Sequence, residues 1–248
     1  KSVPRIFSVP NDHGLITQSL GTLKIRGTDF VERAETTSPT NGASDIITGD
    51  GGSDRIFGGS AGDFINYEPP AGTGIEPTPG LGQTGDDIII ADNGYAILDP
   101  IQNNRPIQLV TNVPDQGGKD YVYANEGRKI VFGGADEDVI VAGGDEISDI
   151  LVGDEGFAQF DQLSGKLTLI STHTPLAGAR DVLIAGAAAN VLVGGSGGDD
   201  IRGGSVRDLV LGDNGDIALN ADGTMQKISS NMAGLETGKE FEVQVHVG

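Results

Sequence analysis

The sequence predicts an all-β repeat protein in which short strands alternate with glycine-rich turns. Forty of its 248 residues are glycine, a share of about 16% against a usual ~7%. Three eight-residue segments match almost position for position, and they begin 62 and 59 residues apart. Self-similarity at a fixed period is typical of stacked repeat architectures. The three segments are residues 87–94, 149–156 and 208–215.

A shorter period of nine residues runs inside each of these repeats. In the third repeat Asp181, Asn190, Asp199 and Asp208 are each nine residues apart, and an apolar-rich triplet follows each of them. Such a triplet forms a short strand with its middle side chain pointing inward. The residues between triplets must turn the chain, and paired glycines supply the positive-φ conformations that such turns need.

The clearest nine-residue unit is 194–202, Gly-Gly-Ser-Gly-Gly-Asp-Asp-Ile-Arg, and units 58–66 and 133–141 are similar. They match G-G-x-G-x-D-x-U-x, where U is a large apolar residue. With about ten such units in three groups, the chain resembles the RTX (haemolysin-type) calcium-binding nonapeptide-repeat family. The resemblance implies a right-handed parallel β-roll, or β-solenoid, with two nonapeptides per coil. It covers roughly residues 41–67, 83–94, 117–156 and 178–215.

Composition excludes several other classes of protein. The chain has no Cys, so disulfide-stapled domains and Cys-ligated metal sites are impossible. Its 36 acidic and 16 basic residues give a net charge of −20, which disfavours nucleic acid as a partner. No apolar run approaches the ~20 residues of a membrane span. An acidic, glycine-rich chain needs a cation, and the resemblance implies that this cofactor is Ca²⁺, which binds hard oxygen ligands.

The resemblance also implies where calcium binds. Turns on the same edge of the roll are eighteen residues apart, so their aspartates and backbone carbonyls converge into oxygen cages. One edge carries only Asp, whereas Lys129 and Asn190 interrupt the other. We expect calcium to concentrate on the first edge, about one ion per repeat, because Lys129 brings its own cation. The first edge comprises Asp45, Asp63, Asp120, Asp138, Asp181 and Asp199. Further candidate ligands are Asp54, Asp87, Asp149 and Asp208.

Between the nonapeptide groups the sequence predicts β-hairpins. Alternating apolar segments flank Asn103-Asn104, Ser164-Gly165 and Asp222-Gly223, and Asp-Gly is a typical hairpin turn. The hairpins either extend and cap the roll or contact a partner. We therefore divide the chain into an N-terminal β-strand cap or linker and three repeat units, the first with a Pro/Gly loop and the last with a terminal strand. These are residues 1–40, 41–116 (loop 67–82), 117–177 and 178–248.

Two motifs suggest catalysis, but neither is supported by its context. Residues 58–62 and 194–198 match G-x-S-x-G, yet no helix pattern follows, as a hydrolase nucleophile requires. His13, His173 and His246 show no metal-ligand spacing, and surface or packing roles are favoured. We expect no catalytic residues and no enzymatic activity.

Other acidic residues are less easily assigned. Residues 92–94, 154–156 and 213–215 recur in phase as Asp-Asn-Gly or Asp-Glu-Gly. This is either turn chemistry or an extra calcium ligand. We expect solvent exposure for Asp136, Asp145 and Asp200, which are out of register.

These observations predict a calcium-binding structural β-solenoid of a secreted or cell-surface bacterial protein, such as an adhesin, surface layer or extracellular filament. The family implies folding on calcium after type I secretion. The alternative is the C-terminal folding and secretion module of a secreted enzyme or toxin. Glycan binding by the hairpins is disfavoured because there is no Trp. Expected partners are calcium ions and other copies of the repeat, with no nucleic acid and no membrane span. The first residue is Lys, so we expect a processed product or an excised piece.

Overall fold

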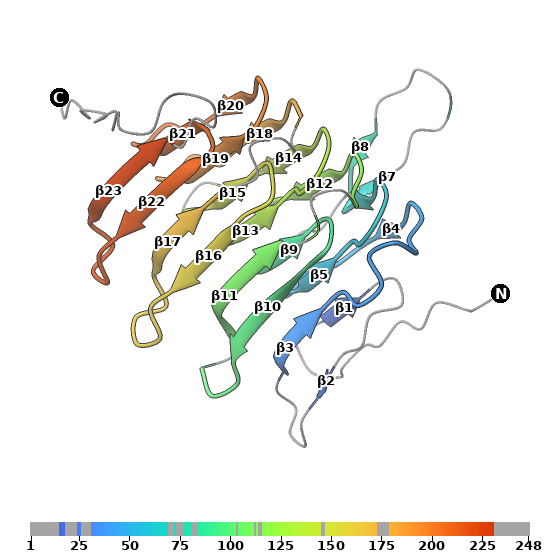
Figure 1. Ribbon diagram of the computed structural model, residues 1–248, viewed down its shortest axis with the longest axis horizontal. Coiled ribbons are helices and arrows are strands. Elements are labelled where there is room, and N and C mark those ends of the chain that lie inside the picture. The colour runs from blue at the N-terminus through green and yellow to red at the C-terminus, as the bar shows by residue number, and fades with distance from the viewer. Residues whose placement is uncertain are drawn as a thin grey trace.

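The protein is described by a computed structural model, and the residues that it describes are all strand, turn or irregular backbone. The prediction of an all-β fold is confirmed, since the described residues contain no helix. Three sheets, which we name the central, outer and hairpin sheets, run from the N-terminal end (blue) to the C-terminal end (red) of Figure 1. The described residues are 15–17, 24–25, 31–68, 72, 77–80, 84–102, 104–111, 113, 116–144, 147–172 and 179–230.

The central sheet is parallel and is buried on both faces. All four residues of its strands β9 and β13 are buried, as expected for a parallel sheet covered on both sides. Ile89 packs against the outer sheet, whereas Ile88 and Ile90 pack against the hairpin sheet. The strand order is β1 (Leu15–Thr17), β5 (Arg55–Phe57), β9 (Asp87–Ile90), β13 (Lys129–Phe132), β15 (Ile150–Val152), β19 (Val191–Gly195) and β21 (Leu209–Asp213).

The outer sheet is also parallel, but only one of its faces is fully buried. In β14, Ile140 is buried while Val139 and Val141 are half-buried, which is the alternation expected of the nonapeptide triplets. The strands are β4 (Ile46–Ile47), β6 (Phe64–Ile65), β12 (Tyr121–Ala124), β14 (Val139–Ala142), β18 (Val182–Ile184) and β20 (Asp200–Arg202).

The predicted hairpins are present, and they join into one antiparallel sheet. Adjacent hairpins pair with each other, as in the contact of β11 with β16. This hairpin sheet covers the face of the central sheet that the outer sheet leaves open, and Leu98, Leu109 and Ile170 lie in the shared core. The strands are β2 (Lys24–Ile25), β3 (Val31–Glu35), β10 (Gly94–Asp99), β11 (Arg105–Thr111), β16 (Phe157–Phe160), β17 (Leu167–Ser171), β22 (Gly215–Leu219) and β23 (Met225–Ser230).

Each repeat visits the sheets in the same order: outer, central, outer, central, and then the hairpin sheet. The first repeat also inserts a two-strand ladder, β7 (Tyr67–Glu68) with β8 (Thr78–Pro79), within the expected Pro/Gly loop. At the N-terminal end, β1 and the β2–β3 hairpin follow the order of the second half of a repeat. The division into residues 1–40, 41–116, 117–177 and 178–248 stays a prediction.

Candidate metal centre

Six aspartates lie in successive turns, each directly before one strand of the outer sheet. They stack into a continuous column, which we name the aspartate ladder. In every step a backbone N–H donates to the Oδ1 atom of the aspartate in the next coil. The five donor–acceptor distances lie between 2.6 and 3.0 Å. The structure thus brings together all of the residues predicted for the first edge, namely Asp45, Asp63, Asp120, Asp138, Asp181 and Asp199.

The second carboxylate oxygen of most ladder residues is buried without a protein donor. The Oδ2 atoms of Asp63, Asp120, Asp138 and Asp181 accept no hydrogen bond from any described residue. Burial raises the pKa of Asp63 to about 7 and the pKa of Asp181 to about 8. Burial, followed by neighbouring carboxylates, raises the pKa of Asp120 and Asp138 well above the ordinary range. A cation beside Oδ2 would offset the desolvation that disfavours the charged form.

Backbone carbonyl oxygens from the next coil face the same Oδ2 atoms. A Cβ atom added to Gly133 would collide with both Asp138 Oδ2 and Gly153 O, so these two oxygens border one small volume. Only glycine leaves that space open. The same pairs of oxygens surround Gly58 (Asp63 Oδ2, Ala91 O), Gly153 (Asp181 Oδ2, Gly194 O) and Gly194 (Asp199 Oδ2, Gly212 O).

These oxygens fit calcium, which takes 6–8 oxygen ligands from carboxylates and backbone carbonyls. Nowhere in the described part of the chain do three His, Asp or Glu side chains converge on one point. A cation held here would therefore depend on backbone carbonyls as well as on the ladder carboxylates. Glycine at these turn positions keeps the space between the two kinds of oxygen open.

Asp92 and Asp154, which the sequence left between turn chemistry and calcium binding, lie buried against the ladder turns. Asp92 Oδ2 accepts a hydrogen bond from Ala135 N at 2.6 Å, and Asp154 Oδ2 accepts one from Ser196 N. The Oδ1 atom of each receives none from the described residues. Burial raises both pKa values to about 9. Their in-phase recurrence was the only sequence signal for this position, and the third copy, Asp213, is exposed.

A second column of stacked residues lies where the chain enters the central-sheet strands, and we name it the mixed ladder. Its members are Asp54, Asp87, Lys129, Asp149, Asn190 and Asp208. Lys129 is fully buried, and its Nζ atom donates to Asp87 Oδ2 at 2.7 Å and to Gly85 O at 2.6 Å. The ammonium group thus contacts one carboxylate oxygen and one backbone oxygen.

Asn190 likewise fills its turn with hydrogen-bond donors. Its Nδ2 atom donates to Gly186 O at 2.9 Å, Ala188 O at 2.6 Å and Asp208 Oδ1 at 3.0 Å. Burial raises the pKa of Asp149 to about 6, and its Oδ2 atom receives no donor from the described chain. Burial and the nearby Asp87 raise the pKa of Asp54 to about 7.

The remaining candidates lie away from these columns or outside the described residues. Ser60 Oγ accepts from Asn93 Nδ2 at 3.2 Å, and Ser196 Oγ accepts from Asn214 Nδ2 at 2.6 Å. Asp136 is exposed, whereas Asp200 is part-buried and pairs with Arg202 at 2.8 Å. Outside the described residues lie His13, His173, His246, Asp145 and the terminal strand expected within 241–248.

The fold and the oxygen-lined turns define a β-solenoid of the cation-binding repeat class. The family model of the RTX calcium-binding nonapeptide repeat matches four copies, in residues 40–67, 116–146 and 177–210. These residues match the RTX calcium-binding nonapeptide repeat, so the resemblance given by the nonapeptides is confirmed. No curated protein and no solved structure matches the chain. RTX repeats occur in secreted bacterial proteins. None of the described segments is a helix long and apolar enough to cross a membrane.

Proposed function

We propose that the chain is a structural β-solenoid of a secreted or cell-surface bacterial protein, whose folding is coupled to calcium binding along the aspartate ladder. The observation that carries this proposal is the row of buried Oδ2 atoms at Asp63, Asp120, Asp138 and Asp181. A buried carboxylate is costly unless it is paired or coordinates a metal. The described chain supplies no such partner at Oδ2, so these groups are neutralised either by a proton or, as we propose, by bound calcium.

The proposal follows from the balance between charge, glycine entropy and burial. Ordering forty glycines costs more conformational entropy than ordering most other residues. A net charge of −20 also opposes compaction by self-repulsion. When bound, calcium supplies positive charge and binds oxygen ligands from adjacent coils. Chains in low-calcium cytosol would then stay unfolded, and they would fold after export.

Within this proposal the ladder residues hold calcium through Oδ2, together with carbonyls of the next coil. We propose that Asp92 and Asp154 also bind calcium in these turns or support the residues that do. The mixed ladder is the second candidate for calcium binding. Asp87 and Asp208 already bond to Lys129 and Asn190, whereas Asp54 and Asp149 stay secondary candidates.

The proposed biological role is an adhesin, surface layer or extracellular filament. The repeating order of sheets supports it, because β1 to β3 continue the pattern of the three repeats at the N-terminal end. Such a stack extends by adding further copies of the same unit. The absence of enzymatic activity stays a prediction. Flanking sequence in the parent protein distinguishes this role from a folding module, since many further repeats favour a filament and a catalytic region favours a secreted enzyme.

The test is a calcium titration followed by far-UV circular dichroism, with EGTA reversal and a magnesium control. We expect a cooperative gain of β signal that is specific to calcium. In Asp138→Asn the side chain keeps an oxygen for the Asp120 N–H bond at 2.8 Å but loses its charge and one ligand. The calcium midpoint should rise about tenfold, because ligand charge sets affinity.

Asp208→Asn is the matched control, because its side-chain oxygen accepts from Asn190 on the mixed ladder. Its midpoint should change much less. Equal shifts in the two variants would contradict the assignment of calcium to the aspartate ladder. A chain that is fully folded in EGTA would contradict calcium-coupled folding itself.

A further inference from the structure

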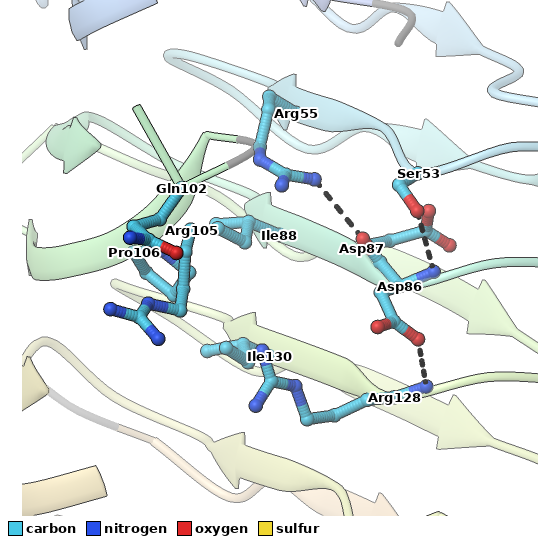
Figure 2. A pocket seen from close by; sticks show the side chains of 10 residues that line it. All are labelled: Ser53, Arg55, Asp86, Asp87, Ile88, Gln102, Arg105, Pro106, Arg128 and Ile130. Atoms are coloured by element: carbon cyan, nitrogen blue, oxygen red, sulfur yellow. Dashed lines mark hydrogen bonds between the residues drawn. The ribbon is translucent and has the colours of Figure 1, made fainter. Parts of the chain in front are cut away.

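A cavity of about 200 Å³ lies between the central sheet and the β10–β11 hairpin. Figure 2 shows Arg55 and Arg128 on its two sides, with Ile88 between them. Ile88 and Ile130 supply an apolar surface, and the hairpin contributes Gln102, Arg105 and Pro106. We name this cavity the arginine pocket. Three arginines around one cavity are unexpected in a chain with 16 basic and 36 acidic residues.

The arginines of the pocket bond to neutral groups and not to carboxylates. Arg55 donates to Asp54 O, Asp86 O and Asn104 O at 2.9, 3.0 and 3.1 Å. Arg105 donates to the carbonyl oxygens of Gln162 and Leu163 in the neighbouring hairpin. None of the three arginines forms an ion pair with a carboxylate of the described residues. Their positive charges are therefore not cancelled by direct contact.

Two donor groups of the pocket are also unused. The Nε atom of Arg55 is buried and donates to no described residue. The Arg128 side chain makes no hydrogen bond with the described part of the chain, although its backbone N–H donates to Asp86 Oδ1 at 3.0 Å. Burial lowers the pKa of Arg55, because the charged guanidinium is partly removed from water. An anion in the cavity would offset that loss.

The acidic residues of the pocket do not supply this anion. Asp87 uses Oδ2 for Lys129 and Oδ1 for the Asp54 N–H, at 2.7 and 2.9 Å. Asp86 is exposed, and its Oδ1 atom accepts the backbone N–H of Arg128. Three arginines and Lys129 thus face Asp86, Asp87 and the nearby Asp54, four positive groups against three negative ones, which leaves a small local positive charge on an acidic protein.

We propose that the arginine pocket binds an oxyanion, the carboxylate or sulfate group of a ligand. Guanidinium groups recognise planar and tetrahedral oxyanions through paired N–H donors. The guanidinium of Arg128, which makes no hydrogen bond with the described part of the chain, supplies such donors, and Arg55 adds positive charge to the same cavity. This binding is separate from the aspartate ladder, since none of the six aspartates of that ladder lines the cavity.

The test is a nuclear magnetic resonance titration of the calcium-saturated protein, observing the arginine Nε–Hε signals. The probes are sodium glucuronate, which carries a carboxylate on a sugar, and sodium sulfate. Sodium chloride keeps the ionic strength constant, glucose is the neutral control, and an electrode monitors free calcium. We expect saturable shifts of Arg55 and Arg128 with at least one anion and none with glucose. A glucuronate response without a sulfate response identifies a carboxylate site, and the reverse identifies a sulfate site.

Arg128→Gln removes one guanidinium without removing a hydrogen bond of its side chain to the described protein, so folding should be retained. We expect anion affinity to fall about tenfold or more, as for loss of a hydrogen bond to a charged group. Gln102→Glu should also weaken binding, because it adds a negative charge at the exposed rim. Arg207→Gln is the matched control, since Arg207 is exposed on the third repeat. The proposal is overturned by unsaturable shifts, or by equal affinity in Arg128→Gln and the unsubstituted protein.

Discussion

The two turn columns share one repeat period and, except at the step from Asp87 to Lys129, one backbone hydrogen-bond pattern, but they handle positive charge in opposite ways. Every rung of the aspartate ladder is Asp, and four of its Oδ2 atoms receive no donor from the described chain. In the mixed ladder, Lys129 and Asn190 interrupt the acidic series. Lys129 donates to a carboxylate and a carbonyl oxygen of the neighbouring coil, whereas Asn190 donates to Asp208 of the next coil and to carbonyl oxygens of its own turn.

The identity of one residue in each nonapeptide, the ladder residue, therefore determines how the negative charge of a turn is neutralised. The backbone N–H to Oδ1 bond is kept at 2.8 Å between Lys129 and Asp149, as it is between Asp120 and Asp138. Lys129 thus donates its backbone N–H as the aspartates do, but its side chain accepts none, and Asp87 N donates to Arg128 O at 3.0 Å instead. What changes is whether the positive charge is part of the chain, as in Lys129, or is supplied by calcium from solution, as we propose for the aspartate ladder.

The largest expected effect comes from removing the internal cation. Lys129→Met leaves Asp87 Oδ2 and Gly85 O buried without their donor. Breaking a buried ion pair at one partner costs about 3–5 kcal/mol, so the calcium-saturated protein should lose this much unfolding free energy in urea. Lys129→Asp makes the rung resemble the aspartate ladder. It should restore stability only in calcium and bind about one more ion, measured by calorimetry and metal analysis.

The comparison fails if Lys129→Met is as stable as the unsubstituted protein, because the ammonium would then contribute nothing to that turn. It also fails if Lys129→Asp binds no additional calcium. In that case a property other than charge, such as the arrangement of the backbone carbonyl oxygens, would keep calcium from binding at the mixed ladder.

The sequence predicted the columns because a period of nine determines which residues stack. Asp45 and Asp63 are eighteen residues apart, and one coil separates them in the structure. The covering hairpin sheet was harder to foresee. Pairing of β11 with β16 joins residues about fifty positions apart, and nothing in two separate hairpin patterns specifies that they share an edge. The same limit applies to the arginine pocket, since Arg55 and Arg128 come from different repeats.

A smaller effect is expected from filling the space between ladder oxygens. Gly133→Ala would place a methyl group against Asp138 Oδ2 and Gly153 O. The calcium midpoint should rise about tenfold, because strain or displacement of one ligand alters a site whose affinity depends on ligand number. Gly212→Ala is the control at the equivalent position of the last coil, where no atom of another residue lies within 4 Å of the added Cβ.

Isothermal titration of both alanine variants with calcium distinguishes site geometry from general backbone stiffening. Stiffening alone would affect the two variants similarly. A midpoint shift confined to Gly133→Ala supports a cation at the aspartate ladder, and identical midpoints would remove the glycine column from the proposed site.

The smallest expected effect is the pH dependence of the calcium-free chain. Burial raises the pKa of Asp63 to about 7 and of Asp181 to about 8, whereas an unfolded Asp titrates near about 3.9. The folded chain therefore binds more protons than the unfolded chain between about pH 4 and pH 8, and its stability should fall as pH rises through this window.

Circular dichroism in EGTA should accordingly show a partial gain of β signal on acidification from pH 8 to pH 5. Saturating calcium should remove this gain, because bound cations replace protons at the ladder carboxylates. Asp181→Asn should flatten the profile. Asp200→Asn should not, since a hydrogen bond from Arg202 lowers the pKa of Asp200. A β signal that instead increases with pH would mean that the ladder carboxylates are ionised in the calcium-free fold, so their burial would not be what couples the aspartate ladder to calcium.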